Sequence, residues 1–218
     1  MKLTVLYDNE IFKKELGLKS DWGFSCLIQN NDETILFDTG AKGEILLDNM
    51  KKLGINPNDI NKIIISHEHW DHNGGLKTLV SLKNNVEIYR FEKRFFNKNI
   101  KTIIVKEPMK ISDDIYTTGR LKGSPVDEQS LVLKTNKGNY ILTGCSHPGV
   151  IEIIKNAKKI DNIVGIIGGF HGFKELQIFE ELDYICPCHC TKYKNKILRI
   201  YPDKTSRCGV GKVIDLEI

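Results

Sequence analysis

The chain has 218 residues, of which 40% are hydrophobic and 28% charged, and its formal net charge is +4. These values are ordinary for a globular protein long enough to bury a core. The lysines are dispersed, so we expect a solvated basic surface, and nucleic acid is not indicated as a partner. No stretch approaches the ~20 apolar residues that a membrane-spanning helix needs, so no membrane contact is expected.

The N-terminus and the cysteines indicate the compartment. The opening segment MKLTVLYDNE lacks the apolar core of a secretory signal, which favours a cytoplasmic location. In a reducing compartment, cysteines are interpreted as buried small residues, metal ligands or redox thiols before disulfides. Cys26, in the apolar run GFSCLI, is predicted to be a core residue. The six cysteines are Cys26, Cys145, Cys186, Cys188, Cys190 and Cys208.

The first half of the chain alternates strand-like and helical segments. Apolar positions spaced three and four apart predict helices, and short β-type runs predict strands. The polar residues 29–33 indicate a hairpin turn. The predicted strands cover residues 3–7, 24–29, 34–40 and 62–66, and the predicted helices cover 43–54 and 76–82.

The second half begins with further strands and ends with β–α units. A hairpin is expected across residues 136–139, and Pro148 is expected at the start of a helix, where its missing N–H costs little. The predicted strands are 86–90, 102–106, 115–119, 130–135, 139–144, 162–169, 184–188 and a last one near 211–218; the predicted helices are 148–159 and 173–182.

These elements predict the fold class. The sequence contains no internal repeat, low-complexity tract or linker, so a single domain over residues 1–218 is expected. Strands at both ends with β–loop–α units between them predict two sheets packed together and covered by helices. The expected architecture is therefore an α/β protein of the αββα four-layer sandwich type.

All six histidines directly follow apolar, strand-like runs or lie in the loops after them. Loops at the carboxyl ends of strands are where layered α/β proteins usually build their sites. We therefore expect these histidines to belong to a functional site. They are His67, His69, His72, His147, His171 and His189.

The segment SHEHWDHNGG, residues 66–75, is the strongest chemical signal. His67 and His69 are two residues apart, so their side chains emerge on the same side of an extended segment. Asp71 and His72 follow at the turn into the next helix. Imidazole and carboxylate ligands suit zinc, iron or manganese better than calcium or magnesium. The Gly74–Gly75 pair is expected to let the backbone turn tightly there.

This segment resembles the H-x-H-x-D-H motif of the metallo-β-lactamase fold superfamily. LFDTG, residues 36–40, is similar to the aspartate-containing strand end that precedes that motif. LTGCSHPGV, IIGGFH, CHCT and CGVGKVIDL follow in the same order, so the resemblance covers nearly the whole chain. These later motifs resemble the branch of dihydropterin–ribofuranosylaminobenzene-phosphate synthase.

The resemblance implies a site with one or two metal ions, which would be zinc (Zn2+), with Mn2+ or Fe2+ as alternatives. His67, His69 and a later histidine would form the first metal position. Asp71, His72 and His189 would form the second. Asp38 is expected to orient a ligand histidine through a hydrogen bond rather than to contact the metal.

The sequence departs from the family pattern at two places. The segment SPVDEQS, residues 124–130, lacks the histidine of the family's Gly-His-Ser/Thr turn, and positions 73–146 contain none. If the first position is complete, as the resemblance implies, His147 would supply its third nitrogen. Cys145 stands where many relatives have an aspartate that bridges two metals. It is either a thiolate ligand or a small residue in the turn, and a single metal with a weak second position remains an alternative.

The resemblance also implies an activity. We expect a metal-dependent hydrolase, or a related lyase or transferase, that activates water and acts on a small-molecule substrate. The branch implies a phosphate ester or a pterin-linked phosphosugar. Asp71 would hold the activated water as well as ligate, and His171 would face the substrate as an acid/base or anion contact. For His171, the alternatives are direct ligation of the metal or a structural role. For the whole protein, the alternatives are a non-catalytic metal- or ligand-binding module and a diiron redox protein.

The cysteine-rich segment ICPCHCTKYK, residues 185–194, allows two interpretations. A zinc knot is disfavoured because Cys-x-Cys-x-Cys lacks the spacing of converging thiolate pairs. The alternative is a strand over 184–188 that delivers His189 to the metal centre. The cysteines are then mainly small residues near the site, and Cys190 is the one for which a functional role is expected. CHCT resembles the branch's terminal motif, although Lys192 stands where glycine is common. The oligomeric state is not indicated by the sequence.

Overall fold

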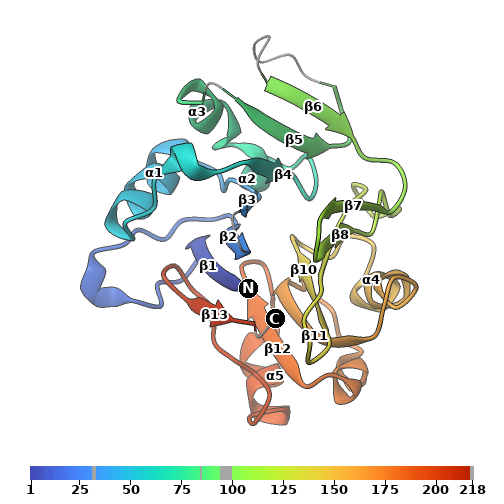
Figure 1. Cartoon of the computed structure of the whole chain (residues 1–218). Helices are drawn as coiled ribbons and strands as arrows, with labels where there is room; N and C mark the ends of the chain where they lie inside the picture. The colour runs from blue at the N-terminus through green and yellow to red at the C-terminus, as the bar shows by residue number, and fades with distance from the viewer. Residues whose placement is uncertain (31–32, 84, 94–99, 217–218) are drawn as a thin grey trace. The chain divides into compact units, whose positions relative to one another are not determined.

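The computed structural model describes residues 1–30, 33–83, 85–93 and 100–216 (Figure 1). The chain divides into two compact units, one made of Met1–Val105 with Cys208–Leu216 and the other of Lys106–Arg207. Each unit contains one β-sheet with its own helices and its own apolar core. This division does not test the single domain expected over residues 1–218, which stays a prediction.

The sheet of the first unit is mixed. Its strand order is β13-β1-β2-β3-β4-β5-β6, antiparallel from β13 to β3 and parallel from β3 to β6. Parallel neighbours need crossover connections, and helices supply them between β3 and β4 and between β4 and β5. The strands are β1 (Lys2–Tyr7), β2 (Ser25–Asn30), β3 (Glu33–Phe37), β4 (Lys62–Ile64), β5 (Val86–Arg90), β6 (Ile100–Ile104) and β13 (Val213–Asp215).

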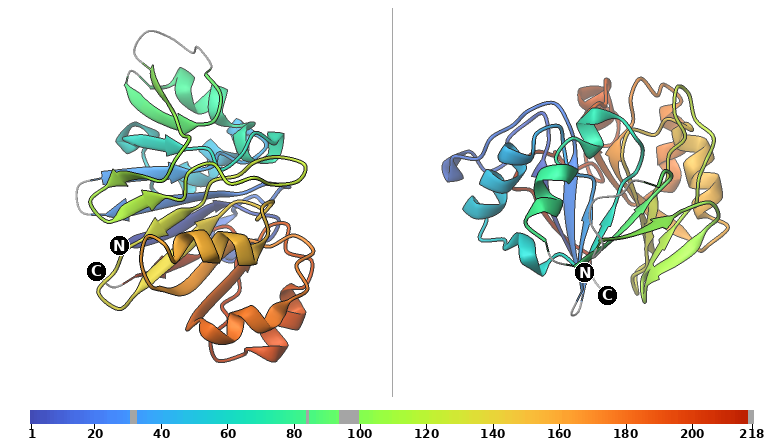
Figure 2. Two further views of the ribbon diagram at one scale, coloured as in Figure 1. Left: turned by 90° about the vertical axis from the view of Figure 1, so that its right-hand side faces the viewer. Right: turned by 90° about the horizontal axis from the view of Figure 1, so that it is seen from above.

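The helices of the first unit are α1 (Gly43–Lys52), the one-turn α2 (Trp70–Asn73) and α3 (Leu76–Ser81), with 3-10 turns η1 (Lys14–Leu16) and η2 (Pro57–Asp59). Helices α1 and α3 lie on one face of this sheet (Figure 2). Leu46 and Met50 of α1 are four apart, so they share a helix face, and both are completely buried. They form one core cluster with Leu79 of α3 and Leu36 of β3.

The sheet of the second unit has the order β12-β11-β10-β9-β8-β7, antiparallel from β7 to β10 and parallel from β10 to β12. Ile153 and Ile154 of α4, Phe179 of η3 and Ile197 of α5 share a core with the sheet. The elements are β7 (Met109–Ser112), β8 (Ile115–Thr117), β9 (Leu131–Leu133), β10 (Asn139–Thr143), α4 (Val150–Ala157), β11 (Ile163–Gly169), η3 (Leu176–Glu181), β12 (Tyr184–Cys188) and α5 (Lys194–Ile200).

The predicted elements are largely present, with local corrections. The hairpin between β2 and β3 is confirmed by the pair Asn30↔Glu33, while its turn residues 31–32 lie outside the described residues. Residues 217–218 of the expected last strand lie outside them too. Helix α4 begins at Val150 after Gly149, not at Pro148. The segment expected to be a helix over 173–182 forms only the tighter 3-10 helix η3, and β7 and α5 were not predicted.

The parallel strands decide where functional loops can gather. Strands β3 and β4 of the first unit end just before Asp38 and the segment from Ser66. In the second unit, β10, β11 and β12 run in the same direction, so the loops after Thr143, Gly169 and Cys188 leave one edge of the sheet. In the ranges that the structure describes, no helix has both the length and the apolar character that crossing a membrane demands.

Candidate functional site

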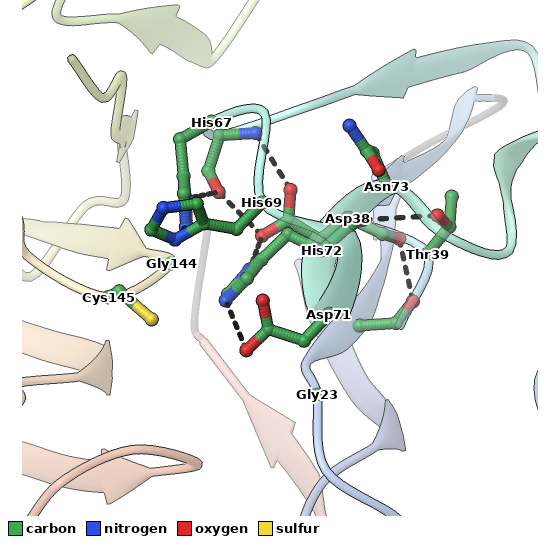
Figure 3. A network of polar contacts seen from close by, with 12 residues as sticks. Gly23, Asp38, Thr39, His67, His69, Asp71, His72, Asn73, Gly144 and Cys145 are labelled. Carbon is green, nitrogen blue, oxygen red and sulfur yellow. Dashed lines mark hydrogen bonds and ion pairs between the residues drawn. The ribbon is translucent and has the colours of Figure 1, made fainter. Parts of the chain in front are cut away.

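A buried carboxylate, Asp38, organises the first group of candidate residues (Figure 3). Its Oδ1 accepts the backbone N–H of Ser66 at 2.7 Å, and its Oδ2 accepts the Ser66 hydroxyl at 2.7 Å. Nδ1 of His72 lies 2.7 Å from the same Oδ2. The hydrogen bond that was expected between Asp38 and a candidate ligand histidine is therefore present.

These contacts determine the tautomers of two histidines. Because the carboxylate accepts, Nδ1 of His72 carries the proton and its Nε2 carries the lone pair. The Ser66 hydroxyl donates to Asp38, so at its 2.9 Å contact with Nδ1 of His67 the serine oxygen accepts. Nε2 of His67 therefore also carries a lone pair. Burial raises the pKa of Asp38, and the contacts with His72 and Ser66 oppose that rise.

The other side chains of the H-x-H-x-D-H segment converge on the same point. Nε2 of His67 lies 3.2 Å from Nδ1 of His69, so the two side chains face each other as the extended spacing predicts. The rings of His67 and His72 are 4.1 Å apart between centroids. Nε2 of His72 lies 3.9 Å from Oδ2 of Asp71. The structure thus brings all four predicted residues of this segment together.

Asp71 is held in place by a tryptophan. Its Oδ2 accepts the indole N–H of Trp22 at 2.8 Å, which restricts rotation of the carboxylate. The carboxylate side chain is mostly buried, whereas half of the Trp22 surface is exposed. The backbone also fixes this turn, because the Asp71 carbonyl accepts the N–H of Phe24 at 3.2 Å. Trp22 is a site residue that sequence reasoning missed.

A buried ion pair holds the loop that carries His67 and His69. Both Nε and Nη2 of Arg90 donate to the carboxylate of Glu68, which lies between the two histidines in the chain. Asn73 donates to the same carboxylate at 3.0 Å and to the Glu68 carbonyl at 3.2 Å. Arg90 is 1% exposed. The loop is therefore anchored through Glu68, between the two histidines.

The explanation expected for Gly74 and Gly75 was wrong. Both have ordinary helical dihedral angles, with φ of −63° and −76°, so no tight turn requires them. They are needed for close packing instead. A Cβ on Gly74 would collide with the carbonyl oxygen of Ala41, and one on Gly75 with that of Thr39. The helix start carrying His72 can approach β3 only because these side chains are absent.

In the second unit, the buried carboxylate of Glu128 anchors the loop after β10. Its Oε1 accepts the Thr143 hydroxyl and the successive backbone N–H groups of residues 144, 145 and 146, at 2.9 to 3.2 Å. Its Oε2 accepts the N–H of His147 at 2.8 Å. Glu128 belongs to the segment 124–130 that lacks the family's histidine. The segment therefore acts here by holding the loop that carries Cys145 and His147.

His147 and His171 lie together in this unit, near Cys145. The two rings are 4.8 Å apart between centroids, and ligand atoms of the three residues lie within 4.8 Å of one another. Nδ1 of His147 lies 3.3 Å from the Ser124 carbonyl, which only accepts, so Nε2 carries the lone pair. His171 is exposed. The glycines before it lie in strand β11 itself rather than in a flexible loop.

His189 and Cys190 follow β12 and also lie near Cys145. The ligand atoms of Cys145, His189 and Cys190 also fall within 4.8 Å of one another. Thr191 ties this loop to its neighbour, because its hydroxyl donates to the Cys188 carbonyl at 2.7 Å and accepts the Phe170 N–H at 3.0 Å. The predicted strand Tyr184–Cys188 thus delivers His189 to a cluster of candidate ligands.

Backbone strain gathers at these same loops. Among the described residues, four non-glycine residues have a positive φ: Asp38 (59°), Ser146 (62°), His171 (43°) and His189 (44°). Each immediately follows a strand end or lies within three residues of one. Such conformations cost free energy and persist where surrounding contacts enforce them, most often at functional sites. Two of the four are histidines predicted to belong to the site.

The donor set fits a metal ion. Each of His67, His72 and His147 has its Nδ1 engaged, so Nε2 is left in the unprotonated form that a metal requires. Imidazole nitrogens with a carboxylate or thiolate nearby suit zinc, and also iron or manganese. The structure therefore offers candidate His, Asp and Cys ligand groups in each unit.

The α/β fold and the imidazole clusters at the ends of parallel strands indicate a metal-binding protein, and comparison of the sequence with family models identifies its superfamily. The sequence model of the metallo-beta-lactamase superfamily matches residues 23–149, which is more than half of the chain. The chain therefore belongs to that superfamily. The fold class predicted from the sequence is confirmed. The superfamily relation supports a metal-dependent hydrolase or a related function.

Three known proteins are similar to the chain over most of its length. The chain is 28% identical to the 7,8-dihydropterin-6-methyl-4-(beta-D-ribofuranosyl)-aminobenzene-5'-phosphate synthase of Methanocaldococcus jannaschii, over 89% of this chain and 90% of that protein. It is similar to the solved structure of Tm1679, a metal-dependent hydrolase of the beta-lactamase superfamily, with a TM-score of 0.83, 26% identity and complete coverage of both chains. The short form of human tRNase Z shares the fold, with a TM-score of 0.66, 16% identity and complete coverage of both.

Proposed function

We propose that the chain is a metal-dependent hydrolase, or a related lyase or transferase, acting on a phosphate ester or a pterin-linked phosphosugar. The observation that carries the metal-dependent part is the hydrogen-bond chain from Asp38 through Ser66 to His67, together with the bond from His72 to Asp38. It leaves Nε2 of two neighbouring buried histidines ready to ligate. The similarity to the Methanocaldococcus jannaschii synthase, whose name contains an aminobenzene ribofuranosyl phosphate, supports the substrate class.

The metal ligands in this proposal are the six residues that the family motif implies, and zinc is the proposed ion, with manganese or iron as alternatives. A bound ion would lower the pKa of its water molecule to about 7 and polarise the group that is attacked. The proposed ligands are His67, His69, Asp71, His72, His147 and His189.

The chain's own residues would supply orientation and proton transfer. Asp71, fixed by the indole N–H of Trp22, would accept a proton from the attacking water and would orient that water toward the group that is attacked. His171 would donate a proton from its imidazolium to the leaving oxygen, since it is exposed and lies 4.8 Å from His147 between ring centroids. The Arg90–Glu68 pair would keep His67 and His69 in position.

The test is metal removal and restoration. The purified protein is treated with a chelator, its metal content is measured, and hydrolysis of generic phosphoesters is followed before and after adding zinc or manganese. We expect activity to fall with metal content and to return with one of the ions. Activity that survives complete metal removal would contradict the proposal. Tight metal binding without turnover on phosphoesters, lactones and thioesters would identify a binding module instead.

A further inference from the structure

Two cysteines that are far apart in the sequence meet in the second unit. The Sγ atoms of Cys145 and Cys190 are 3.3 Å apart, although 45 positions separate them. Cys145 follows β10 and Cys190 follows β12, so strand β11 lies between the two strands that present them. The distance is beyond a disulfide bond of ~2.05 Å, but a small side-chain rotation would close it.

The surrounding structure holds the two sulfurs in this approach. The backbone N–H of Cys145 is fixed by Glu128 at 3.0 Å. On the other side, Thr191 clamps the loop of Cys190 to Phe170. Gly169 lies beneath the pair, and a Cβ at that position would come within 2.6 Å of the Cys190 sulfur. The absence of that side chain therefore makes the space in which the sulfurs meet.

The two thiols differ in access to solvent. Cys145 is 3% exposed, whereas Cys190 is only half-buried. A small oxidant would therefore reach Cys190 first and Cys145 only through it. A partly accessible thiol beside a buried one is the arrangement in which a second cysteine resolves a mixed disulfide.

We propose that Cys145 and Cys190 form a reversible disulfide when the protein meets a low-molecular-weight disulfide such as oxidised glutathione. Cys190 loses its proton to solvent and its sulfur attacks the small disulfide, which forms a mixed disulfide and releases one small thiol. Cys145 then loses its proton and attacks the Cys190 sulfur, which releases the second small thiol. The protein loses two electrons and two protons, and the small disulfide gains them as two thiols.

The bond would act on the candidate site. His189 immediately precedes Cys190 with a φ of 44°, and His147 follows Cys145 by two residues. A Cys145–Cys190 bond would tie together the two loops that carry these histidines and would remove both thiols from the candidate ligand groups. We infer that oxidation lowers metal affinity, a consequence that rests on the proposed function, whereas formation of the disulfide does not.

A second cysteine pair provides an internal comparison. Cys186 and Cys188 have sulfurs 3.9 Å apart, but both are completely buried and lie two residues apart on strand β12. The Cys188 thiol also donates to the Cys186 carbonyl at 3.2 Å. Neither thiol is accessible to a small oxidant, so this pair should stay reduced under conditions that oxidise the other.

Tryptic peptides distinguish the two pairs. Cleavage after lysine places Cys145 in peptide 138–155 and the other three in peptide 175–192. The metal-free full chain is treated with oxidised glutathione, alkylated, digested and analysed by mass spectrometry. We expect the two peptides to be joined, the link to break with dithiothreitol, and the link to be lost in Cys190→Ser but kept in Cys186→Ser. Circular dichroism confirms that each variant is folded.

Some outcomes overturn the disulfide and others only its effect on the site. A folded wild-type protein in which peptides 138–155 and 175–192 stay separate, or a link that persists in Cys190→Ser, overturns the disulfide. Zinc affinity is measured separately on reduced and oxidised protein, with at least a tenfold loss expected on oxidation. An unchanged affinity overturns the regulatory consequence and leaves the disulfide. A reduced protein that binds no metal contradicts the proposed function instead.

Discussion

Nδ1 of His72 lies 2.7 Å from Oδ2 of Asp38, and both side chains are completely buried. The same oxygen accepts the hydroxyl of Ser66, which in turn accepts the N–H of His67. One carboxylate therefore sets the protonated nitrogen of two imidazoles. Because metal ligation requires the opposite nitrogen of each ring, Asp38 prepares both histidines before any ion is bound.

Replacing Asp38 by asparagine should separate this role from folding. The position has a φ of 59°, which asparagine tolerates well, so the backbone can be retained. The amide NH2 would face one of the donors that now bind the carboxylate. We expect zinc affinity, measured by competition with a chromophoric chelator, to fall by about 10- to 100-fold.

A matched control is Asp48→Asn, since Asp48 pairs with Lys19 and Lys52 on the surface of the first unit. Surface ion pairs contribute little, so this variant should bind zinc like the wild type. Folded Asp38→Asn protein with unchanged zinc affinity would contradict the role assigned to the carboxylate.

Ser66→Ala tests the link to His67. The variant keeps the Ser66 backbone N–H on Oδ1 of Asp38 but removes the hydroxyl between Asp38 and His67. We expect a loss of zinc affinity of about tenfold. Since the hydroxyl acts through Asp38, the double variant with Asp38→Asn should lose less than the product of the two single losses. Losses that simply multiply would show that the two residues act independently.

The sequence predicted the candidate residues because their periodicity and position are local properties. The spacing of two between His67 and His69 predicts that their side chains share one side. All six histidines follow apolar runs, and these runs form the strands β4, β10, β11 and β12. The family resemblance predicted a hydrogen bond from Asp38 to a ligand histidine, and the structure identifies that histidine as His72. By contrast, the glycine pair at 74–75 was assigned to a turn, because sequence does not distinguish a turn from close packing against Thr39 and Ala41.

The supporting residues could not be predicted, because their partners are distant in the chain. Glu128 lies in a polar segment and would ordinarily be solvated, yet its carboxylate binds backbone groups 16 to 19 positions further on. Arg90 ends a strand and pairs with Glu68, 22 positions earlier. Only tertiary structure brings such groups together. A buried charge needs several polar partners, and a sequence pattern does not show which distant groups will supply them.

Glu128→Gln should destabilise the protein. The carboxylate is completely buried and accepts four backbone N–H groups and one hydroxyl, so the amide must place a donor against donors. We expect the free energy of unfolding, measured in urea, to fall by about 2 kcal/mol. The exposed Glu107→Gln in the same unit should change it by less than about 0.5 kcal/mol. Equal, small effects in both variants would contradict the anchoring role.

The Arg90–Glu68 pair should behave as a buried ion pair. Arg90→Met leaves the largely buried Glu68 carboxylate without its cation, so the free energy of unfolding should fall by about 3 kcal/mol. The double variant Arg90→Met/Glu68→Leu removes both charges and should be less destabilised than Arg90→Met alone. A double variant that is more destabilised than the single one would show that packing, and not charge compensation, dominates at this position.

Trp22→Phe tests the indole that holds Asp71, and the chain's other tryptophan provides the control. The variant keeps an aromatic ring but loses the N–H that Oδ2 of Asp71 accepts at 2.8 Å. Hydrogen bonds to charged groups contribute about 1.5 to 3 kcal/mol, so kcat/KM on a hydrolysed phosphoester should fall at least about tenfold. Trp70→Phe changes a residue next to Asp71 in the chain that is 62% exposed, and it should leave kcat/KM within about twofold. Equal losses in both variants would contradict a specific role for the indole N–H, because they would then reflect only the loss of exposed aromatic surface near Asp71.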